Sequence, residues 1–250
     1  SDRGMDSLAG LEVLESLSLE SDRITSKAMP ALAKLKNLKA LTLSRTQIDD
    51  EGLRQLGTLK GLTGLHLDES NGISDKGVAF LAGLESLESL SLASTRITSK
   101  SVPTMARLRN LKCLVLANTQ IDDEGLRRLA DLKQLAVLEL AGTPITDVGA
   151  KLCFPELGYL NLKDTKLTDV GLRHIAQSPK LRCLVIAGTR VTDASTETLA
   201  GMPSLMTVYA YDTHIDQESP QWLRLMKTLE SKRASEEDVA LQGHARNRPQ

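Results

Sequence analysis

Residues 38–59 read LKALTLSRTQIDDEGLRQLGTL, and variants of this stretch recur along most of the chain. The middle leucine of its LxL segment, Leu41, has a counterpart in each copy. These counterparts are Leu17, Leu65, Leu90, Leu114, Leu138, Leu160, Leu184 and Val208. Six of the eight steps between neighbouring copies are 24 residues, and the other two are 25 and 22. A fixed period of this length is typical of repeat proteins, in which similar units stack side by side.

Each copy predicts one short strand and one short helix. The LxL segment alternates with period 2, which places both leucines on one face of a strand. The GLxxLxxL segment that follows has helical spacing, so its leucines share one face of a helix. A single unit cannot bury both apolar faces, whereas stacked neighbours can. We therefore expect nine parallel strands in one concave sheet, with short helices on the convex side.

The motif LxxLxLxxTxIxDxGLxxLxxL resembles the leucine-rich repeat family, and its 24-residue spacing is similar to that of repeat proteins found in bacteria. The resemblance covers roughly residues 1–220. It implies an α/β fold, a right-handed leucine-rich-repeat solenoid (horseshoe) with a concave parallel β-sheet and convex short helices. It also implies a non-enzymatic module that binds a protein partner.

The chain is predicted to have three segments. Residues 1–219 form the solenoid, which starts in the middle of a repeat because its first residues match 74–84. We therefore expect a fragment of a longer protein, and a naturally short N-terminus is the alternative. Residues 220–232 predict a capping helix, since Trp222, Leu225, Met226 and Leu229 share one helical face. Residues 233–250 are charged and poor in apolar side chains, which is typical of a flexible tail.

Small and polar residues form columns between strand and helix. A threonine column that includes Thr46 is expected to satisfy backbone groups of its own and adjacent coils. Acidic pairs such as Asp49–Asp50 could suggest acid–base catalysis, but their position favours helix N-caps and first-turn acids that complement the helix dipole. A glycine column that includes Gly171 predicts close packing between coils. The sixth unit is two residues shorter, so its helix is predicted to be a turn that ends by Pro155.

Composition argues against several classes of protein. The net charge is −1 with 25% charged residues, so no basic field indicates nucleic acid or an anionic membrane. No apolar run approaches the roughly 20 residues of a membrane-spanning helix. The chain has 45 leucines but only 2% aromatic residues, which predicts an aliphatic core.

Reactive groups are scattered rather than clustered. Cys113 and Cys183 belong to strands three coils apart, about 14 Å, which is beyond disulfide reach. Cys153 is expected towards the helical side. Free thiols predict a reducing, cytoplasmic location, and an export signal upstream is the alternative. Because no histidine has a metal-binding companion and no phosphate-binding glycine loop occurs, we expect no metal, no cofactor and no enzymatic activity.

The candidate binding surface is the concave face, formed by the residues around the leucines of each LxL segment. All three tyrosines of the chain are predicted to lie on it within three adjacent coils. With their neighbours they give the predicted partner-binding residues, which are Tyr159, Asn161, Cys183, Val185, Tyr209 and Tyr211. Small residues between aromatic walls, with Tyr159 about 10 Å from Tyr209, favour an interface. The alternative interpretation is that tyrosine simply favours strands.

An internal duplication gives a second indication. Residues 1–67 align with 74–140 without a gap, and 43 of the 67 positions are identical. Six of eight concave-facing positions differ, against 18 of 59 elsewhere. This favours a concave face that diversified to meet a ligand, and free drift of exposed positions is the alternative.

The sequence therefore predicts a monomeric, non-enzymatic protein–protein interaction module that binds a partner on its concave face. The turn that starts at Ile145, ITDVG, also looks like that of F-box leucine-rich proteins. This leaves open the substrate-recognition part of a ubiquitin-ligase-type adaptor or effector, although the chain has shorter repeats and lacks the cysteine column of those proteins. A structural surface repeat protein is a further alternative.

Overall fold

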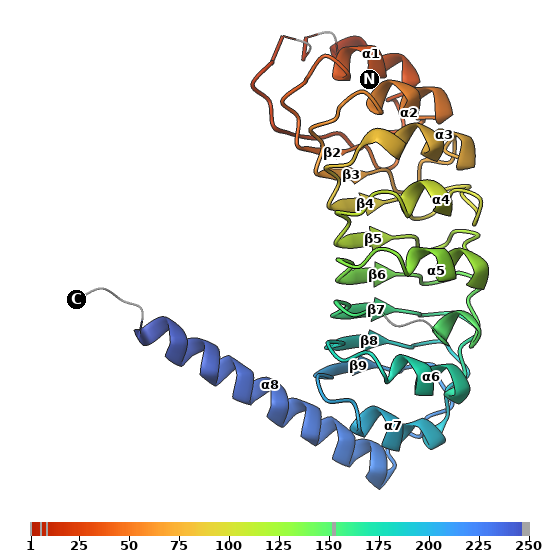
Figure 1. Cartoon of the computed structure of the whole chain (residues 1–250), viewed down its shortest axis with the longest axis vertical. Coiled ribbons are helices and arrows are strands. Elements are labelled where there is room, and N and C mark those ends of the chain that lie inside the picture. Colours follow the sequence, from red (N-terminus) through yellow and green to blue (C-terminus); the bar gives the residue numbers. More distant parts are fainter. Residues whose placement is uncertain (1, 6, 9, 152–153, 247–250) are drawn as a thin grey trace.

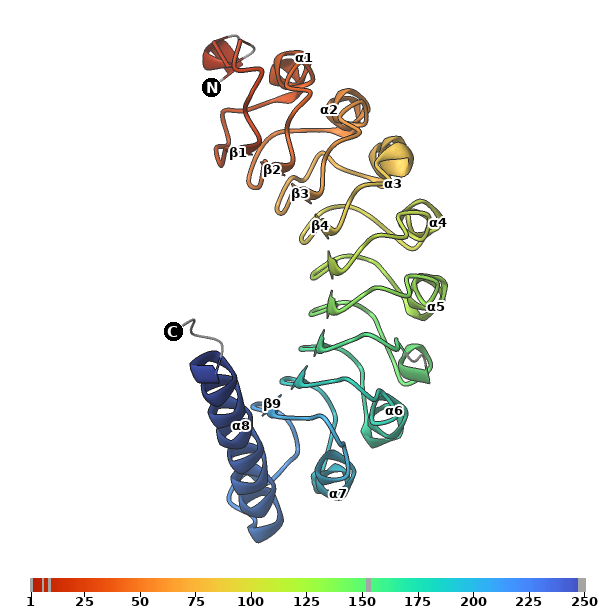
Figure 2. The ribbon, with the colours of Figure 1, turned by 60° about the vertical axis from the view of Figure 1, so that its left-hand side comes forward.

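The repeats build an open solenoid in the computed structural model, which describes residues 2–5, 7–8, 10–151 and 154–246. Figure 2 shows the strands along the inner edge of the arc and the short helices along its outer edge. The first and the last strand in chain order are the two edges of the sheet, which therefore does not close into a barrel (Figure 1). The predicted fold class is confirmed.

Nine three-residue strands lie within the described ranges and form one parallel sheet in chain order. The register aligns the central apolar residue of each repeat with that of the next, from Leu17 beside Leu41 to Leu184 beside Val208. The strands are β1 (Ser16–Ser18), β2 (Ala40–Thr42), β3 (Gly64–His66), β4 (Ser89–Ser91), β5 (Cys113–Val115), β6 (Val137–Glu139), β7 (Tyr159–Asn161), β8 (Cys183–Val185) and β9 (Thr207–Tyr209).

Short helices of two types lie on the convex side, and one long helix, α8, follows the last strand. The α-helices are α1 (Met29–Leu32), α2 (Asp50–Leu56), α3 (Asp75–Ala79), α4 (Val102–Met105), α5 (Asp123–Leu129), α6 (Asp169–Ile175), α7 (Thr196–Ala200) and α8 (Pro220–Arg246). The 3-10 helices are η1 (Asp2–Gly4), η2 (Ser26–Ala28), η3 (Phe80–Gly83), η4 (Gly149–Lys151) and η5 (Asp193–Ser195).

One aliphatic core runs the length of the solenoid between the sheet and the helices. Each coil contributes both strand leucines, such as Leu65 and Leu67, and the apolar face of its helix. These side chains are fully buried in the central coils. Burial of a leucine stabilises the fold by about 1.5–3 kcal/mol, so the repeated leucines supply the main driving force for stacking.

The threonine column closes the turn that follows each strand. The Thr46 hydroxyl donates to the Leu43 carbonyl oxygen at 2.7 Å, and Thr189 donates to Ile186 at 2.6 Å. Both acceptors lie three residues earlier in the same coil. The prediction that these hydroxyls satisfy backbone groups of their own coil is confirmed. In the third unit, Ser70 donates instead to Leu43 of the preceding coil, at 3.3 Å.

Side chains at the helix starts join consecutive coils. At each joint, the residue that follows the N-cap position of one coil contacts the N-cap residue of the next coil. Asp147 is typical, because its carboxylate accepts hydrogen bonds from the backbone N–H and the hydroxyl of Thr168 at 2.8 and 2.6 Å. Gly171 leaves the space for this contact, since a Cβ at that position would lie 2.5 Å from Asp147 Oδ1. The second acid of each pair therefore forms hydrogen bonds to the next coil. The sequence predicted only its favourable position at the start of a helix, and not this contact between coils.

Eight joints among the described residues pair one carboxylate with one hydroxyl. In six of them the carboxylate comes first, and these are Asp2–Thr25, Asp50–Ser74, Asp75–Thr98, Asp123–Thr146, Asp147–Thr168 and Asp169–Thr192. In Ser26–Asp49 and Ser99–Asp122 the order is reversed, and the serine hydroxyl donates to the carboxylate at 2.5 and 2.6 Å. The hydrogen bond from Ser99 lowers the pKa of Asp122. Such charge-assisted bonds are about twice as strong as neutral ones.

The sixth unit contains the predicted turn in place of a longer helix. Its convex element is η4, with three residues, whereas α5 and α6 on either side have seven each. Phe154 is buried in the core beside it. Leu152 and Cys153 lie outside the described residues, so the expected position of Cys153 stays a prediction.

The last helix, α8, begins at Pro220 and covers the open end of the final coil. Trp222, Leu225 and Leu229 are buried against that coil. Proline suits the first position of a helix because its missing N–H would have no helical partner there. Among the described side chains of α8, the buried apolar ones all lie in these first turns, which cover the final coil.

The backbone of α8 continues to Arg246, beyond the predicted helix end at residue 232. Helical backbone thus extends into the segment that the sequence predicts as a flexible tail, and residues 247–250 lie outside the described residues. Low apolar content argues against packing, but it does not prevent a helix that the preceding turns have already nucleated. In Figure 1 this part of α8 projects away from the solenoid.

Candidate functional site

The strand register decides which concave residues are neighbours. In one row, Tyr159 of β7 lies beside Cys183 of β8. In the next row, Val185 of β8 lies between Asn161 of β7 and Tyr209 of β9. The structure therefore places these five predicted residues in two adjacent rows over three strands. Tyr159 and Tyr209 are diagonal to one another, across β8.

The three tyrosines differ in their exposure. The side chains of Tyr209 and Tyr211 are open to solvent, with 49% and 44% of their surface exposed. Tyr159 and Cys183 are half-buried, and Val185 is buried with 8% exposed. Two exposed rings over a buried aliphatic floor form a surface on which a partner could bury large aromatic area.

Tyr159 belongs to a polar cluster with Glu139. Asn161 Nδ2 donates to Glu139 Oε2 at 3.2 Å, and Asn161 Oδ1 accepts from the Lys163 backbone N–H at 2.9 Å. Burial, together with the negative charge of Glu139, raises the pKa of Tyr159 to about 12. Its phenol is therefore neutral at physiological pH, and Asn161 is held in one orientation.

A third row follows the ends of these strands and contains the predicted residue Tyr211, whose contact with Lys163 was not recognised from the sequence. The ammonium group of Lys163 lies 5.5 Å from the centroid of the Tyr211 ring. Ala187 lies between them in the row and is fully buried. A small residue at that position lets Lys163 reach across one coil, and the resulting cation–π contact orients the ring. The signal in the sequence was the Lys–Ala–Tyr order at equivalent positions of three consecutive repeats.

The N-terminal half of the concave face contains no tyrosine, and its polar groups gather around Asp68. The Asp68 carboxylate accepts hydrogen bonds from Ser44 Oγ at 3.2 Å, from the Ala93 backbone N–H at 3.0 Å, and from Ser91 Oγ. Several side chains of this half are therefore already hydrogen-bonded, whereas the C-terminal half presents two exposed rings.

The candidate reactive groups in the described part of the chain include two thiols on the strands. Cys113 and Cys183 are free thiols, as predicted, and burial raises the pKa of each. A protonated thiol is a poor nucleophile at neutral pH. Within the described ranges, no group of three or more His, Cys, Asp or Glu side chains is placed to hold a metal ion. No helix among those residues is long and apolar enough to span a membrane.

Comparison with known proteins gives a consistent result. The family model described as "Leucine-rich repeat region" matches residues 1–231. Among solved structures, the chain is similar to internalin C2 from Listeria monocytogenes, with 27% identity and a TM-score of 0.67, over 84% of this chain and 91% of that one. It shares its fold with internalin InlF from the same bacterium, at 22% identity and a TM-score of 0.58, over 88% of this chain and 74% of that one. No curated protein sequence matches the chain.

Proposed function

Because the chain belongs to the leucine-rich repeat family, we propose that it is a protein–protein interaction module that binds a protein partner through the C-terminal half of its concave face. Family membership and the internalin neighbours support an interaction module. The observation that carries the choice of surface is the exposure of two large aromatic side chains, Tyr209 and Tyr211, next to each other on the concave face. Tyrosines are enriched among the residues that dominate binding energy at interfaces.

The contrast between the two halves of the sheet supports the same surface. In the N-terminal half, a partner would have to replace hydrogen bonds that Asp68 already makes. In the C-terminal half, the Tyr211 ring is oriented in advance by Lys163. Preorganised side chains lose less conformational entropy on binding, so they bind more tightly for the same contact area.

We assign the module no enzymatic activity, and we place the monomeric protein in the cytoplasm. Cys113 and Cys183 support both assignments, because they are free, half-buried thiols and burial raises the pKa of each. Fractionation of the source cell tests the location. Recovery of the protein in the surface or secreted fraction would contradict a cytoplasmic location.

Double substitution of the exposed rings tests the binding surface. We expect Y209A/Y211A to reduce capture of the partner from source-cell extract at least tenfold, because loss of one dominant aromatic contact costs about 2 kcal/mol or more. Circular dichroism should be unchanged, since neither ring is part of the core.

The matched control is S18A/T42A, which changes the same row at the opposite end of the sheet. This variant should capture the partner as the wild type does. Equal capture by Y209A/Y211A, or an equal loss in the control variant, would contradict the proposed surface.

A further inference from the structure

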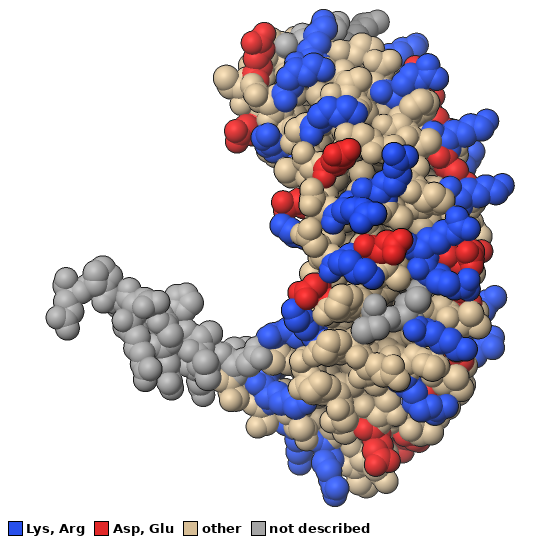
Figure 3. Space-filling view, in the orientation of Figure 1, with Lys and Arg blue, Asp and Glu red and all other residues tan. Residues whose placement is uncertain are grey.

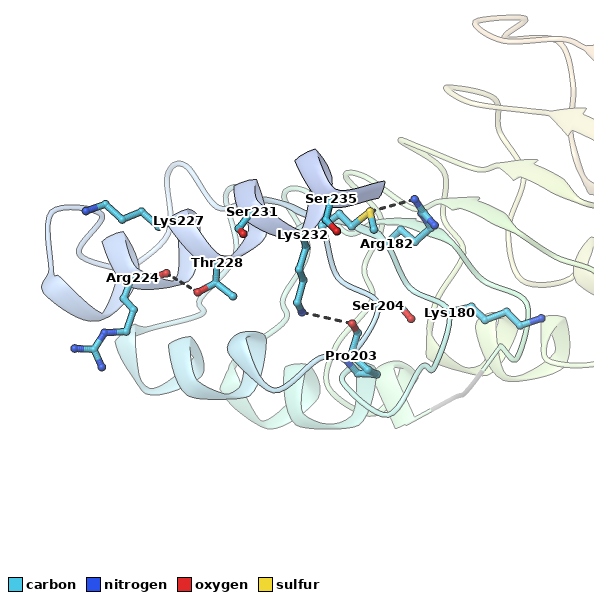
Figure 4. Close-up of a pocket in the computed structure, with 11 residues that line it drawn as sticks. Lys180, Arg182, Pro203, Ser204, Arg224, Lys227, Thr228, Ser231, Lys232 and Ser235 are labelled. Carbon is cyan, nitrogen blue, oxygen red and sulfur yellow. Dashed lines mark hydrogen bonds between the residues drawn. The ribbon is translucent and has the colours of Figure 1, made fainter. Parts of the chain in front are cut away.

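A second concave feature lies outside the sheet, between α8 and the segments that lead into β8 and β9. It is a groove of about 940 Å³, and Figure 4 shows the residues that line it. One wall is the face of α8 that carries Arg224, Lys227 and Ser231, and the other wall contains Lys180 and Arg182. Figure 3 shows basic side chains beside the point where α8 leaves the solenoid.

The charge of this groove has one sign. Five of its eleven lining residues are Lys or Arg, and no Asp or Glu is among the described residues that line it. The chain as a whole has 31 basic and 32 acidic residues, so this separation of charge is local. Lys180 is paired with Glu156 at 2.7 Å, but no carboxylate of the described residues pairs with Arg224 or Lys227. Two cationic side chains on α8 therefore remain available to an anionic ligand.

The walls also present groups that suit a polypeptide backbone. Thr228, Ser231 and Ser235 lie along the groove face of α8 at spacings of three and four residues. The Thr228 hydroxyl donates to the Arg224 carbonyl oxygen at 2.9 Å, so it is left as an acceptor for a bound backbone N–H. Lys232 holds this wall against the other, because its ammonium group donates to the carbonyl oxygens of Met202 and Pro203 at 3.2 and 3.4 Å. Hydrogen bonds between the two walls therefore fix the position of α8 relative to the loop at Pro203.

From these observations we infer that the groove binds an extended acidic peptide segment, whose carboxylates pair with Arg224 and Lys227 and whose backbone contacts the hydroxyls of α8. The lining argues against other anionic ligands. No aromatic residue lines the groove in the described chain, so bases of a nucleic acid would find nothing on which to stack. Binding to a membrane surface requires an apolar face rich in Trp, Phe or Leu, and none of these lines the groove in the described chain. This site is separate from the proposed concave-face interface.

A binding titration with a labelled peptide tests the inference. The probe is a twelve-residue peptide rich in Asp and Glu, and its control is the same peptide with Asn and Gln. We expect fluorescence anisotropy to show saturable binding of the acidic peptide alone at low salt. Binding should weaken at high salt, because the Debye length falls from about 10 Å at 0.1 M to about 3 Å at 1 M.

Charge reversal assigns the binding to the groove. R224E/K227E should weaken binding of the acidic peptide at least tenfold. R107E/R109E changes the net charge by the same amount at exposed positions of another coil, and it should leave the affinity within about twofold of wild type. Y209A/Y211A should also bind the peptide as the wild type does, which separates this site from the concave face.

Three outcomes would overturn the inference. The first is that the acidic peptide does not bind the wild type. The second is that the two charge-reversal pairs weaken binding equally, which would indicate a general electrostatic effect. The third is tighter binding of a single-stranded oligonucleotide, or of vesicles with anionic lipid, than of a peptide of equal charge.

Discussion

One residue in each turn after β2 to β9 adopts the left-handed backbone conformation. Six of these residues have side chains, at φ values of 55–59°, and the series is Arg45, Glu69, Ser94, Asn118, Asp164 and Asp212. Gly142 and Gly188 complete it. The left-handed conformation costs a residue with a side chain about 1–2 kcal/mol, so stacking of the coils imposes this turn on whatever residue occupies the position.

The two glycines are required for a further reason, which gives a prediction at Gly188. A Cβ on Gly188 would overlap Asp164 Oδ1 of the preceding coil, and its φ is +65°. We expect Gly188→Ala to lower the free energy of unfolding by about 1–2 kcal/mol, measured by urea denaturation. Gly158→Ala is the control, because the nearest atom to its Cβ is 3.8 Å away, and it should change stability by less than about 0.5 kcal/mol. If the two variants lost the same free energy of unfolding, neither the backbone conformation nor the contact with Asp164 would constrain residue 188.

At the scale of elements, α8 shows how one helix can have two different surfaces. Leu225 is 2% exposed and packs on the final coil, whereas Leu223 is 49% exposed on the same helix. We expect Leu225→Ala to lower the free energy of unfolding by about 2–5 kcal/mol, because it leaves a cavity against the last coil. Leu223→Ala should change it by less than about 0.5 kcal/mol. Urea denaturation measures both, and a similar loss in the two variants would show that α8 does not cap the core.

The elements themselves were predictable because each is specified by residues of its own repeat. The LxL segments gave the nine strands, and the apolar face of residues 222–229 gave the start of α8. Contacts between repeats were harder to predict, because they depend on register. Lys163 and Tyr211 are 48 residues apart in sequence and meet only when three strands are aligned. Likewise, the basic residues of α8 line a groove only because the helix lies opposite the loop at Pro203, and the sequence does not show that arrangement.

At the scale of the whole molecule, the order of the joints limits which coils can be neighbours. Six coils follow an aspartate and begin with a threonine or a serine. The last coil is different, because it begins with Asp216, whose backbone N–H donates to Asp193 Oδ1 at 2.8 Å. The coil that begins at Asp49 follows Ser26, and the coil that begins at Asp122 follows Ser99. Removing the coil that begins at Thr25 would place Asp2 against Asp49, which brings two carboxylates together. Removing the coil that begins at Asp49 would place Ser26 against Ser74, which leaves two hydroxyls and no carboxylate.

Deletion of single coils tests this restriction. Deleting residues 98–121 would place Asp75 against Asp122, while deleting residues 168–191 would place Asp147 against Thr192; both remove 24 residues. We expect the first deletion to have the lower urea midpoint. Adding Asp122→Thr to it should restore about 1.5 kcal/mol or more, because a hydrogen bond to a charged group replaces a repulsion. The same substitution in the full-length chain should destabilise, since Ser99 would lose its carboxylate partner. A deletion variant that does not respond to Asp122→Thr would show that the joints do not govern coil order.

These joints also constrain how such a protein can evolve in length. The duplicated block carries Asp75–Thr98 and Ser99–Asp122 as copies of Asp2–Thr25 and Ser26–Asp49, so the complementary order was inherited intact. Ser26 pairs with Asp49 of the next coil, and Ser99 pairs with Asp122 of the next coil. We expect unequal recombination to gain or lose the two coils of such a pair together. We therefore expect a crossover that joins mismatched coils to destabilise the fold even when it preserves the 24-residue period.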